Sequence, residues 1–237
     1  MSKKIIHRAN TRGRANHGWL DSHHTFSFSS YYNPERMGFG LLRVLNDDVV
    51  APGMGFGTHP HDNMEIISIP LSGALEHKDS TGNREVIHTN DVQIMSAGFG
   101  LTHSEYNHSQ TEQVNFLQIW VFPKEKDIEP RYEQKTFRPE DRVNKLQTVV
   151  SPDKNNGAVW INQEAWFSLG TLKSGFEEEY KLHKTGNGVY AFVLEGEVEI
   201  DGEKLNKRDG LGISDTDSFS IRASADAGLL LMEVPMK

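Results

Sequence analysis

The sequence predicts an all-β protein that consists of two small β-barrel domains. Short segments in which apolar and polar residues alternate occur along most of the chain, whereas the periodicity of helices is scarce. Glycine, asparagine, aspartate or proline bounds these segments, as is typical of the turns in β-sandwiches and β-barrels. An internal repeat that spans the two halves of the chain is the third observation, and it predicts two copies of one domain.

The predicted strands are rich in β-branched and aromatic residues, which fit the pleated surface of a sheet. They are short, and turn residues follow most of them within a few positions, so each is expected to pair with a neighbour across a tight connection. The clearest strands span residues 40–45, 65–69, 92–95, 115–122, 189–194 and 197–200.

The internal repeat consists of a strand, a glycine turn and a second strand. The glycine is Gly73 in the first half of the chain and Gly196 in the second half. A polar turn and a strand that begins with aspartate follow in both halves, at Asp91 and Asp209. This order of elements predicts that each half folds as its own β-domain.

A polar segment with several prolines separates the two copies. Residues 123–142 contain three prolines and many charged side chains but few aliphatic ones. We therefore predict an N-terminal domain over residues 1–130, a connector over 131–147 and a C-terminal domain over 148–237. Net charge divides equally, because 11 basic and 15 acidic residues lie up to residue 130 and 14 and 18 lie after it, which leaves −4 on each half.

Composition excludes several classes of protein. The 237 residues include no cysteine, which excludes a disulfide framework, a thiolate metal site and a cysteine nucleophile. A net charge of −8 argues against nucleic acid as a partner. The apolar runs are too short to span a membrane, and the N-terminus lacks the apolar core of a signal peptide. We expect a cytoplasmic monomer with no nucleic-acid or membrane partner.

Two pairs of candidate metal ligands stand out among the eleven histidines. His59 and His61 are two residues apart in a segment expected to be extended, and so are His103 and Glu105. Side chains two residues apart on a strand point to the same face. Three imidazoles and one carboxylate suit a divalent first-row metal and leave coordination positions free for substrate or dioxygen. The first domain is therefore predicted to bind metal.

A second carboxylate competes with Glu105 for this role. Glu65 lies four residues after His61, so on a continuous strand it would point to the same face. The spacing of the residues alone does not choose between Glu65 and Glu105.

The internal repeat provides a comparison for the histidine pairs. If the repeats are aligned on their glycine turns and aspartates, the positions of His59, His61, His103 and Glu105 correspond to Leu182, Lys184, Ile221 and Ala223. No ligand type recurs in the second copy. We therefore expect one metal-binding half and one half without metal ligands.

The histidine segments resemble the two cupin motifs, and the chain as a whole resembles the bacterial quercetinase type of the pirin family. Gly53, His59, His61 and Glu65 follow the spacing of the first cupin motif, and residues 100–107 that of the second. The stretches that carry the resemblance to pirins are residues 24–28, 38–48, 55–65, 95–98, 103–107 and 130–134. The resemblance implies two cupin-type β-barrels, each a double-stranded β-helix.

The resemblance also implies a ligand set and a reaction. In the pirins that this chain resembles, the glutamate of the His-x-Glu pair is a metal ligand. The resemblance therefore implies His59, His61, His103 and Glu105 as ligands and Glu65 as a neighbour of the site. The implied activity is a metal-dependent dioxygenase that opens a flavonol such as quercetin with dioxygen and releases carbon monoxide. Glu105 would act as the general base. Fe(II) is the preferred metal, and Mn, Ni, Cu, Co or Zn would also suit these ligands.

An alternative hypothesis comes from the same resemblance. Eukaryotic pirins are proposed to act as redox-sensing metal proteins that bind a partner without turnover. The sequence is compatible with either function.

Several further residues could belong to the site. His17, His23 and His24 with Asp21 could form a second metal cluster, but this segment recurs in the family, which favours a structural role through hydrogen bonds. Phe39, Phe56 and Phe99, each flanked by glycines, are expected to pack in the core or to line a pocket. Gln118 and Trp120 share one face of a predicted strand and could face the barrel interior.

Overall fold

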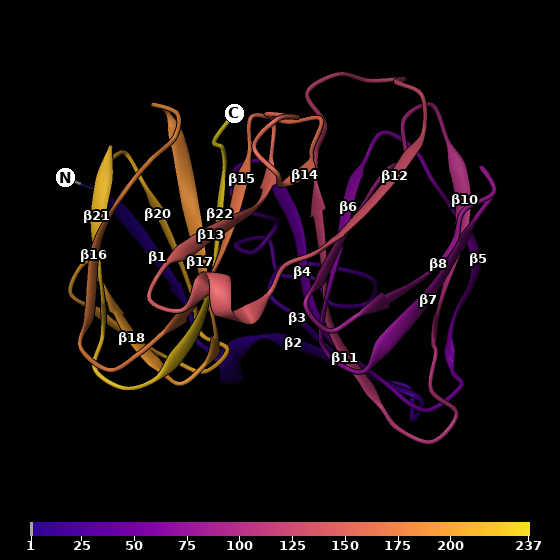
Figure 1. Ribbon diagram of the computed structural model, residues 1–237, viewed down its shortest axis with the longest axis horizontal. Helices are drawn as coiled ribbons and strands as arrows, with labels where there is room; N and C mark the ends of the chain where they lie inside the picture. Colours follow the sequence, from indigo (N-terminus) through magenta and orange to yellow (C-terminus); the bar gives the residue numbers. More distant parts are fainter. Residues whose placement is uncertain (1) are drawn as a thin grey trace.

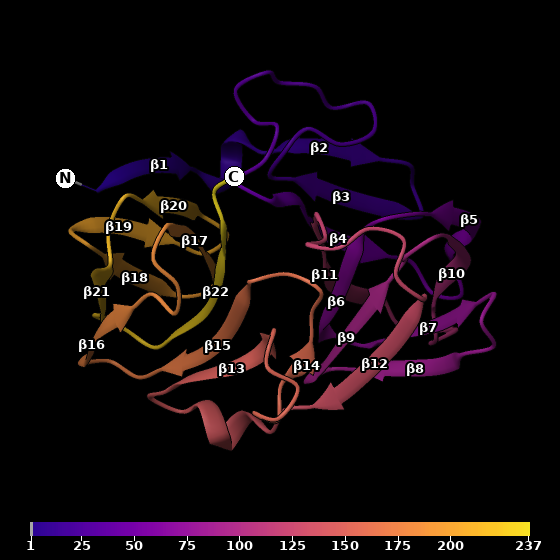
Figure 2. The ribbon, with the colours of Figure 1, turned by 90° about the horizontal axis from the view of Figure 1, so that it is seen from above.

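Two β-barrels lie side by side in the computed structural model, which describes residues 2–237 (Figures 1 and 2). Each barrel pairs a seven-stranded sheet with a four-stranded sheet. The helical elements among the described residues are two short 3₁₀ turns, Ala9–Thr11 and Pro139–Arg142. No helix within residues 2–237 has the length and apolar character needed to cross a membrane. The prediction of an all-β chain with two barrels is confirmed.

The first barrel contains the strands that carry the predicted metal ligands. Its large sheet has the order β12 (Arg131–Thr136), β9 (Asp91–Ser96), β6 (Glu65–Ser72), β11 (Val114–Val121), β4 (Leu42–Val50), β3 (Leu20–His24) and β2 (Gly13–Asn16). Its small sheet has the order β5 (Gly55–His61), β10 (Leu101–Asn107), β7 (Ala74–Asp79) and β8 (Arg84–His88).

The second barrel repeats this arrangement. Its large sheet has the order β1 (Lys3–His7), β20 (Gly210–Ser214), β17 (Asn187–Glu195), β22 (Ala227–Pro235), β15 (Trp166–Leu172), β13 (Leu146–Ser151) and β14 (Val159–Trp160). Its small sheet has the order β16 (Phe176–Lys181), β21 (Ser218–Ala223), β18 (Glu197–Ile200) and β19 (Glu203–Asn206). The six strands predicted from the sequence correspond to β4, β6, β9, β11, β17 and β18.

Strand pairing divides the chain differently from the boundaries expected at residues 130 and 147. β1 pairs with β20 of the second barrel, as Figure 1 shows, although it belongs to the N-terminal range. β12 begins the expected connector, yet it pairs with β9 of the first barrel. Thr136 and Gln134 on β12 bind the Asp91 carboxylate at 2.5 and 2.9 Å, which anchors this strand. The segment between β12 and β13 runs from residue 137 to 145.

Apolar side chains fill the space between the barrels and the interior of the second barrel. One cluster joins residues of β6 and β11 to residues of β15, β17 and β22, among them Ile67, Phe167 and Phe192. A second cluster fills the second barrel. The first barrel instead contains two smaller clusters, one around Phe116 and one around Met95. Its interior thus keeps room for polar side chains.

Phe167→Ala tests the role of the core between the barrels. The side chain is fully buried, so its removal leaves a cavity and is expected to lower the free energy of unfolding by about 3–5 kcal/mol. Urea denaturation followed by circular dichroism measures this change. The control Tyr32→Ala removes a ring that is 73% exposed and is expected to cost less than about 0.5 kcal/mol. Equal effects of the two substitutions would contradict this account of the core.

Candidate metal centre

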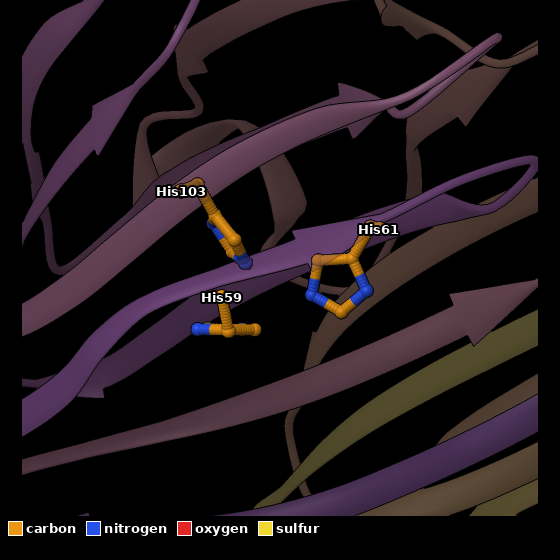
Figure 3. Close-up of side chains that lie close together, drawn as sticks. All are labelled: His59, His61 and His103. Carbon is orange, nitrogen blue, oxygen red and sulfur yellow. The ribbon is translucent and has the colours of Figure 1, made fainter.

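The three predicted histidines converge on the inner face of the first barrel (Figure 3). β5 and β10 are antiparallel neighbours, and His59 is the cross-strand partner of His103. The ring centroids are 4.5 Å apart for His59 and His103, 4.8 Å for His59 and His61, and 4.9 Å for His61 and His103. One potential ligand nitrogen from each ring lies within 4.8 Å of the others. The structure therefore brings together a set of three imidazoles that is suited to a metal ion.

A β-bulge in β5 shapes this convergence. His103 pairs with His59, but Glu105 pairs with Phe56, so β5 has one residue more than β10 over this stretch. Gly57 lies in the bulge, and its carbonyl oxygen accepts a hydrogen bond from His59 Nδ1 at 2.7 Å. This bond leaves His59 Nε2 with the free lone pair, as is typical of histidine ligands. The glycine before the histidine pair thus orients a candidate ligand.

Burial keeps the imidazoles of His61 and His103 neutral. It lowers the pKa of His61 to about 4 and that of His103 to about 3, and the neighbouring histidines lower both values further. Both ring nitrogens of His103 are buried without a hydrogen-bond partner among the described residues. Neutral rings with unused nitrogens are the form that binds a metal. The donor set fits a divalent cation.

Glu105 lies beside His103 on β10 and belongs to a second group of potential ligands. His77, His103 and Glu105 each offer an atom within 4.8 Å of the others, and all three residues are buried. Gln118 Nε2 donates a hydrogen bond to Glu105 Oε2 at 2.8 Å, and the Ser68 hydroxyl lies 3.0 Å from Glu105 Oε1. These contacts from the opposite sheet hold the carboxylate in the barrel interior.

His77 is a site residue that the sequence reasoning missed. It is the cross-strand partner of Glu105, and its ring centroid lies 5.3 Å from that of His103. His77 Nε2 lies 3.1 Å from the Asp79 carboxylate, while Nδ1 is buried without a partner among residues 2–237. The only sign of His77 in the sequence was that Leu75, His77 and Asp79 alternate along one strand and so share one of its faces. The pairing of that strand with β10 was not readable from the sequence.

The contacts of Glu65 differ from those of Glu105. Its carboxylate accepts hydrogen bonds from Ser96 Oγ at 2.8 Å and from the backbone N–H of Asn162 at 3.1 Å. Glu65 is not a member of either group of potential ligands found in the described chain. Because Asn162 belongs to the C-terminal half, Glu65 ties the first barrel to the second.

A cavity of about 500 Å³ borders the histidines. His59 and His61 lie on its wall together with Trp19, Phe56 and Trp120, which gives the cavity flat aromatic sides. A more open hollow of about 600 Å³ lies next to it, and His61 and Trp120 line both. The histidines therefore lie at the edge of a cavity that is large enough for a small-molecule substrate.

The remaining candidate residues divide between core and cavity. Phe56 lines the cavity and Phe99 lines the open hollow, whereas Phe39 packs in the core between the barrels. Gln118 contacts Glu105, and Trp120 borders the histidines, so both side chains of that strand face the interior.

The N-terminal histidines do not form a metal cluster. None of His17, His23 and His24 belongs to a group of potential ligands within residues 2–237, and Asp21 forms an ion pair with Arg14 at 2.7 Å. His24 instead lines the cavity next to the three converging histidines.

The second barrel carries no group of potential metal ligands in the part of the chain that the structure describes. Ile221 and Ala223, which correspond to His103 and Glu105, are buried in its apolar core.

Comparison with known proteins gives the family. The sequence model of the Pirin family matches residues 6–121, and that of the quercetinase C-terminal cupin domain matches residues 148–234. A protein of Escherichia coli K12 named quercetin 2,3-dioxygenase is 47% identical over 97% of this chain and 98% of its own length. The chain belongs to the pirin family.

Solved pirin structures share the whole architecture. The crystal structure of YhhW from Escherichia coli is 45% identical, covers 98% of both chains and superimposes with a TM-score of 0.94. A second crystal structure, of bacterial pirin YhhW in complex with nickel(II), has a TM-score of 0.93 and also 45% identity, with 98% of this chain and 99% of that chain covered. Both barrels of this pirin are therefore cupin domains, as the resemblance implied.

Asp48 is a second buried acid that the sequence reasoning missed. It lies on the cavity wall, and the Ser22 hydroxyl donates a hydrogen bond to it. Burial raises the pKa of Asp48 to about 7, and the nearby Asp47 and Glu105 raise it further. The carboxyl therefore keeps its proton in the folded protein at a pH at which the unfolded chain has lost it.

Asp48→Asn tests this assignment through the dependence of stability on pH. Between pH 5 and 7 the folded protein holds one more proton at this site than the unfolded chain, so the free energy of unfolding of the wild type falls as pH rises. The stability gained by Asp48→Asn is expected to be larger at pH 8 than at pH 5 by about 2–3 kcal/mol. Urea denaturation at both pH values measures the difference.

The exposed Asp217 provides the matched control. Asp217→Asn is expected to change stability equally at pH 5 and pH 8. A gain for Asp48→Asn that is the same at both pH values would show that this carboxyl is ionised in the folded protein.

Proposed function

We propose that this pirin is a metal-dependent dioxygenase that opens the ring of a flavonol of the quercetin type with dioxygen and releases carbon monoxide. The observation that carries the proposal is the convergence of three imidazoles beside an aromatic cavity that His59 and His61 line. The name of the 47% identical relative and the nickel complex of a 45% identical pirin support it. Flavonol and dioxygen are the proposed substrates.

The proposed ligands are His59, His61, His103 and Glu105. The free Nε2 of His59 and the unpartnered nitrogens of His103 support this choice. A bound divalent metal supplies Lewis acidity, which lowers the pKa of a coordinated hydroxyl group. Fe(II) is our first choice because ligand sets of histidine and carboxylate with open positions are typical of non-haem oxygenases. Nickel and the other divalent metals named above would fit the same donors.

Glu105 is the proposed general base. Gln118 Nε2 and the Ser68 hydroxyl hold its carboxylate inside the first barrel, beside His103. In this position the carboxylate can accept the proton of the flavonol 3-hydroxyl group, which leaves the electron pair on the substrate oxygen for the reaction with dioxygen. Both oxygen atoms of dioxygen then enter the ester product, and the carbon that carried the 3-hydroxyl group leaves with its own oxygen as carbon monoxide. The aromatic side chains of the cavity wall would stack against the flat substrate.

Metal binding is expected to stabilise the folded protein. At a free metal concentration a hundred times the dissociation constant, the stabilisation is about 2.7 kcal/mol, so the melting temperature should rise by several degrees. Calorimetry of the metal-free protein with and without added Fe(II) or Ni(II) measures the shift. His103→Asn should lose most of it, whereas the control His88→Asn, at an exposed histidine, should keep it. A shift that survives in His103→Asn would contradict the proposed ligand set.

Turnover is tested with two glutamate variants. Protein reconstituted anaerobically with Fe(II) is mixed with quercetin and dioxygen, and carbon monoxide is measured. Glu105→Gln should lower kcat about 100-fold or more while metal stays bound, because the base is lost. The control Glu65→Gln changes a buried carboxylate outside the groups of potential ligands and should keep turnover.

The outcomes separate the two hypotheses for this family. Carbon monoxide from the wild type and its loss in Glu105→Gln alone support the dioxygenase. Metal binding without turnover of any flavonol tested, for each divalent metal, would overturn it and favour the redox-sensing hypothesis.

A further inference from the structure

Two polar side chains face each other on the cavity wall and are not explained by the metal centre. His24 on β3 and Asn46 on β4 are direct cross-strand partners. Each is only 2% exposed, and each lines the cavity of about 500 Å³ that also borders His59 and His61. They thus line the same cavity as two of the candidate metal ligands.

One buried polar atom of each side chain lacks a hydrogen-bond partner in the described part of the chain. His24 Nδ1 and Asn46 Oδ1 are both buried without a partner among residues 2–237. The next cross-strand pair differs, because the Ser22 hydroxyl donates to the Asp48 carboxyl. Buried polar groups are nearly always hydrogen-bonded, and leaving one unpaired costs about 1–3 kcal/mol. Two adjacent exceptions on the wall of one cavity indicate a ligand that pairs with them.

The surroundings hold the histidine in place. The His24 ring meets Phe28 edge-on, with centroids 5.4 Å apart, and lies 6.3 Å from Tyr31. Packing against these aromatic side chains fixes the orientation of the ring. A polar side chain of fixed orientation is suited to selecting one substituent of a ligand.

The chemistry of the pair selects an uncharged group. Burial lowers the pKa of His24, so the ring is neutral and offers one donor and one acceptor. Asn46 offers an amide with both functions. Asp48 lies on the same wall, so an anionic substituent would meet an acid rather than a cation. A phenolic hydroxyl, which both donates and accepts, matches the pair, and the aromatic walls match the ring that carries it.

We propose that His24 and Asn46 form a subsite that binds a phenolic hydroxyl of the substrate, on a ring other than the one that reacts. This inference rests on the proposed function, since it specifies the class of aromatic substrate that the same cavity takes. The two side chains determine specificity: a substrate without the hydroxyl leaves both of them unpaired.

The experiment compares quercetin with 3-hydroxyflavone, which keeps the reacting hydroxyl and carries no other. The readout is the ratio of the two kcat/KM values in metal-loaded wild type, Asn46→Leu and His24→Phe. Each variant is expected to lower this ratio about 10-fold, the effect of losing one hydrogen bond of about 1.4 kcal/mol. Kinetics with 3-hydroxyflavone should change little. The control Leu20→Met alters an apolar residue of the same cavity and should keep the ratio.

A binding measurement keeps this inference separable from the proposed function. Affinities of the metal-loaded protein for both compounds are measured without oxygen, from the quenching of tryptophan fluorescence. Tighter binding of quercetin that is lost in both variants supports the subsite even if no carbon monoxide is formed, and in that case the proposed function alone fails. Turnover with a ratio unchanged in both variants overturns the subsite and leaves the proposed function standing. Failure of both compounds to bind overturns both.

Circular dichroism and metal content verify that each variant is folded. If His24→Phe does not fold, Asn46→Leu alone decides the inference, because an unchanged ratio in that variant contradicts it.

Discussion

The antiparallel pairing of β5 with β10 is the constraint on which the candidate metal centre depends. It sets His59 opposite His103, and the alternation of each strand brings His61 and Glu105 to the same inner face. The bulge at Gly57 then changes the register by one residue and supplies a carbonyl oxygen that orients the His59 ring. Without this pairing, the three imidazoles would have no reason to meet, because they come from two distant parts of the sequence.

The two barrels use the same architecture for different purposes. The second barrel fills its interior with aliphatic and aromatic side chains, including Ile221 and Ala223 at the positions that correspond to metal ligands. The first barrel has only small apolar clusters inside and places imidazoles, carboxyls and a cavity between its sheets. Hydrophobic burial is the main source of folding stability, so the large core between the barrels compensates for what the first interior lacks. The second barrel supports the site by packing against it.

Three buried carboxyls in the first barrel show how environment assigns different roles to one chemical group. Glu65 accepts hydrogen bonds from Ser96 and Asn162 and links the two halves of the chain. Glu105 lies beside the histidines and is held by Gln118 and Ser68. Asp48 has a single hydroxyl donor in an apolar wall, and burial raises its pKa. The donors around each group, rather than its position in a motif, decide whether it supports the fold, the proposed chemistry or the cavity wall.

The sequence by itself determined the β-strands, the repeat and the two histidine pairs, because alternation along a strand is a local pattern with a period of two residues. The spacing of the residues did not choose between Glu65 and Glu105, which only the resemblance to pirins separated, and the sequence reasoning missed His77 and Asp48. Only the tertiary structure showed the contacts of these four side chains, together with the exchange of β1 into the second barrel and the placement of β12 in the first. Which strands become neighbours, where a bulge shifts the register and which polar atoms remain unpaired depend on contacts between residues far apart in the chain.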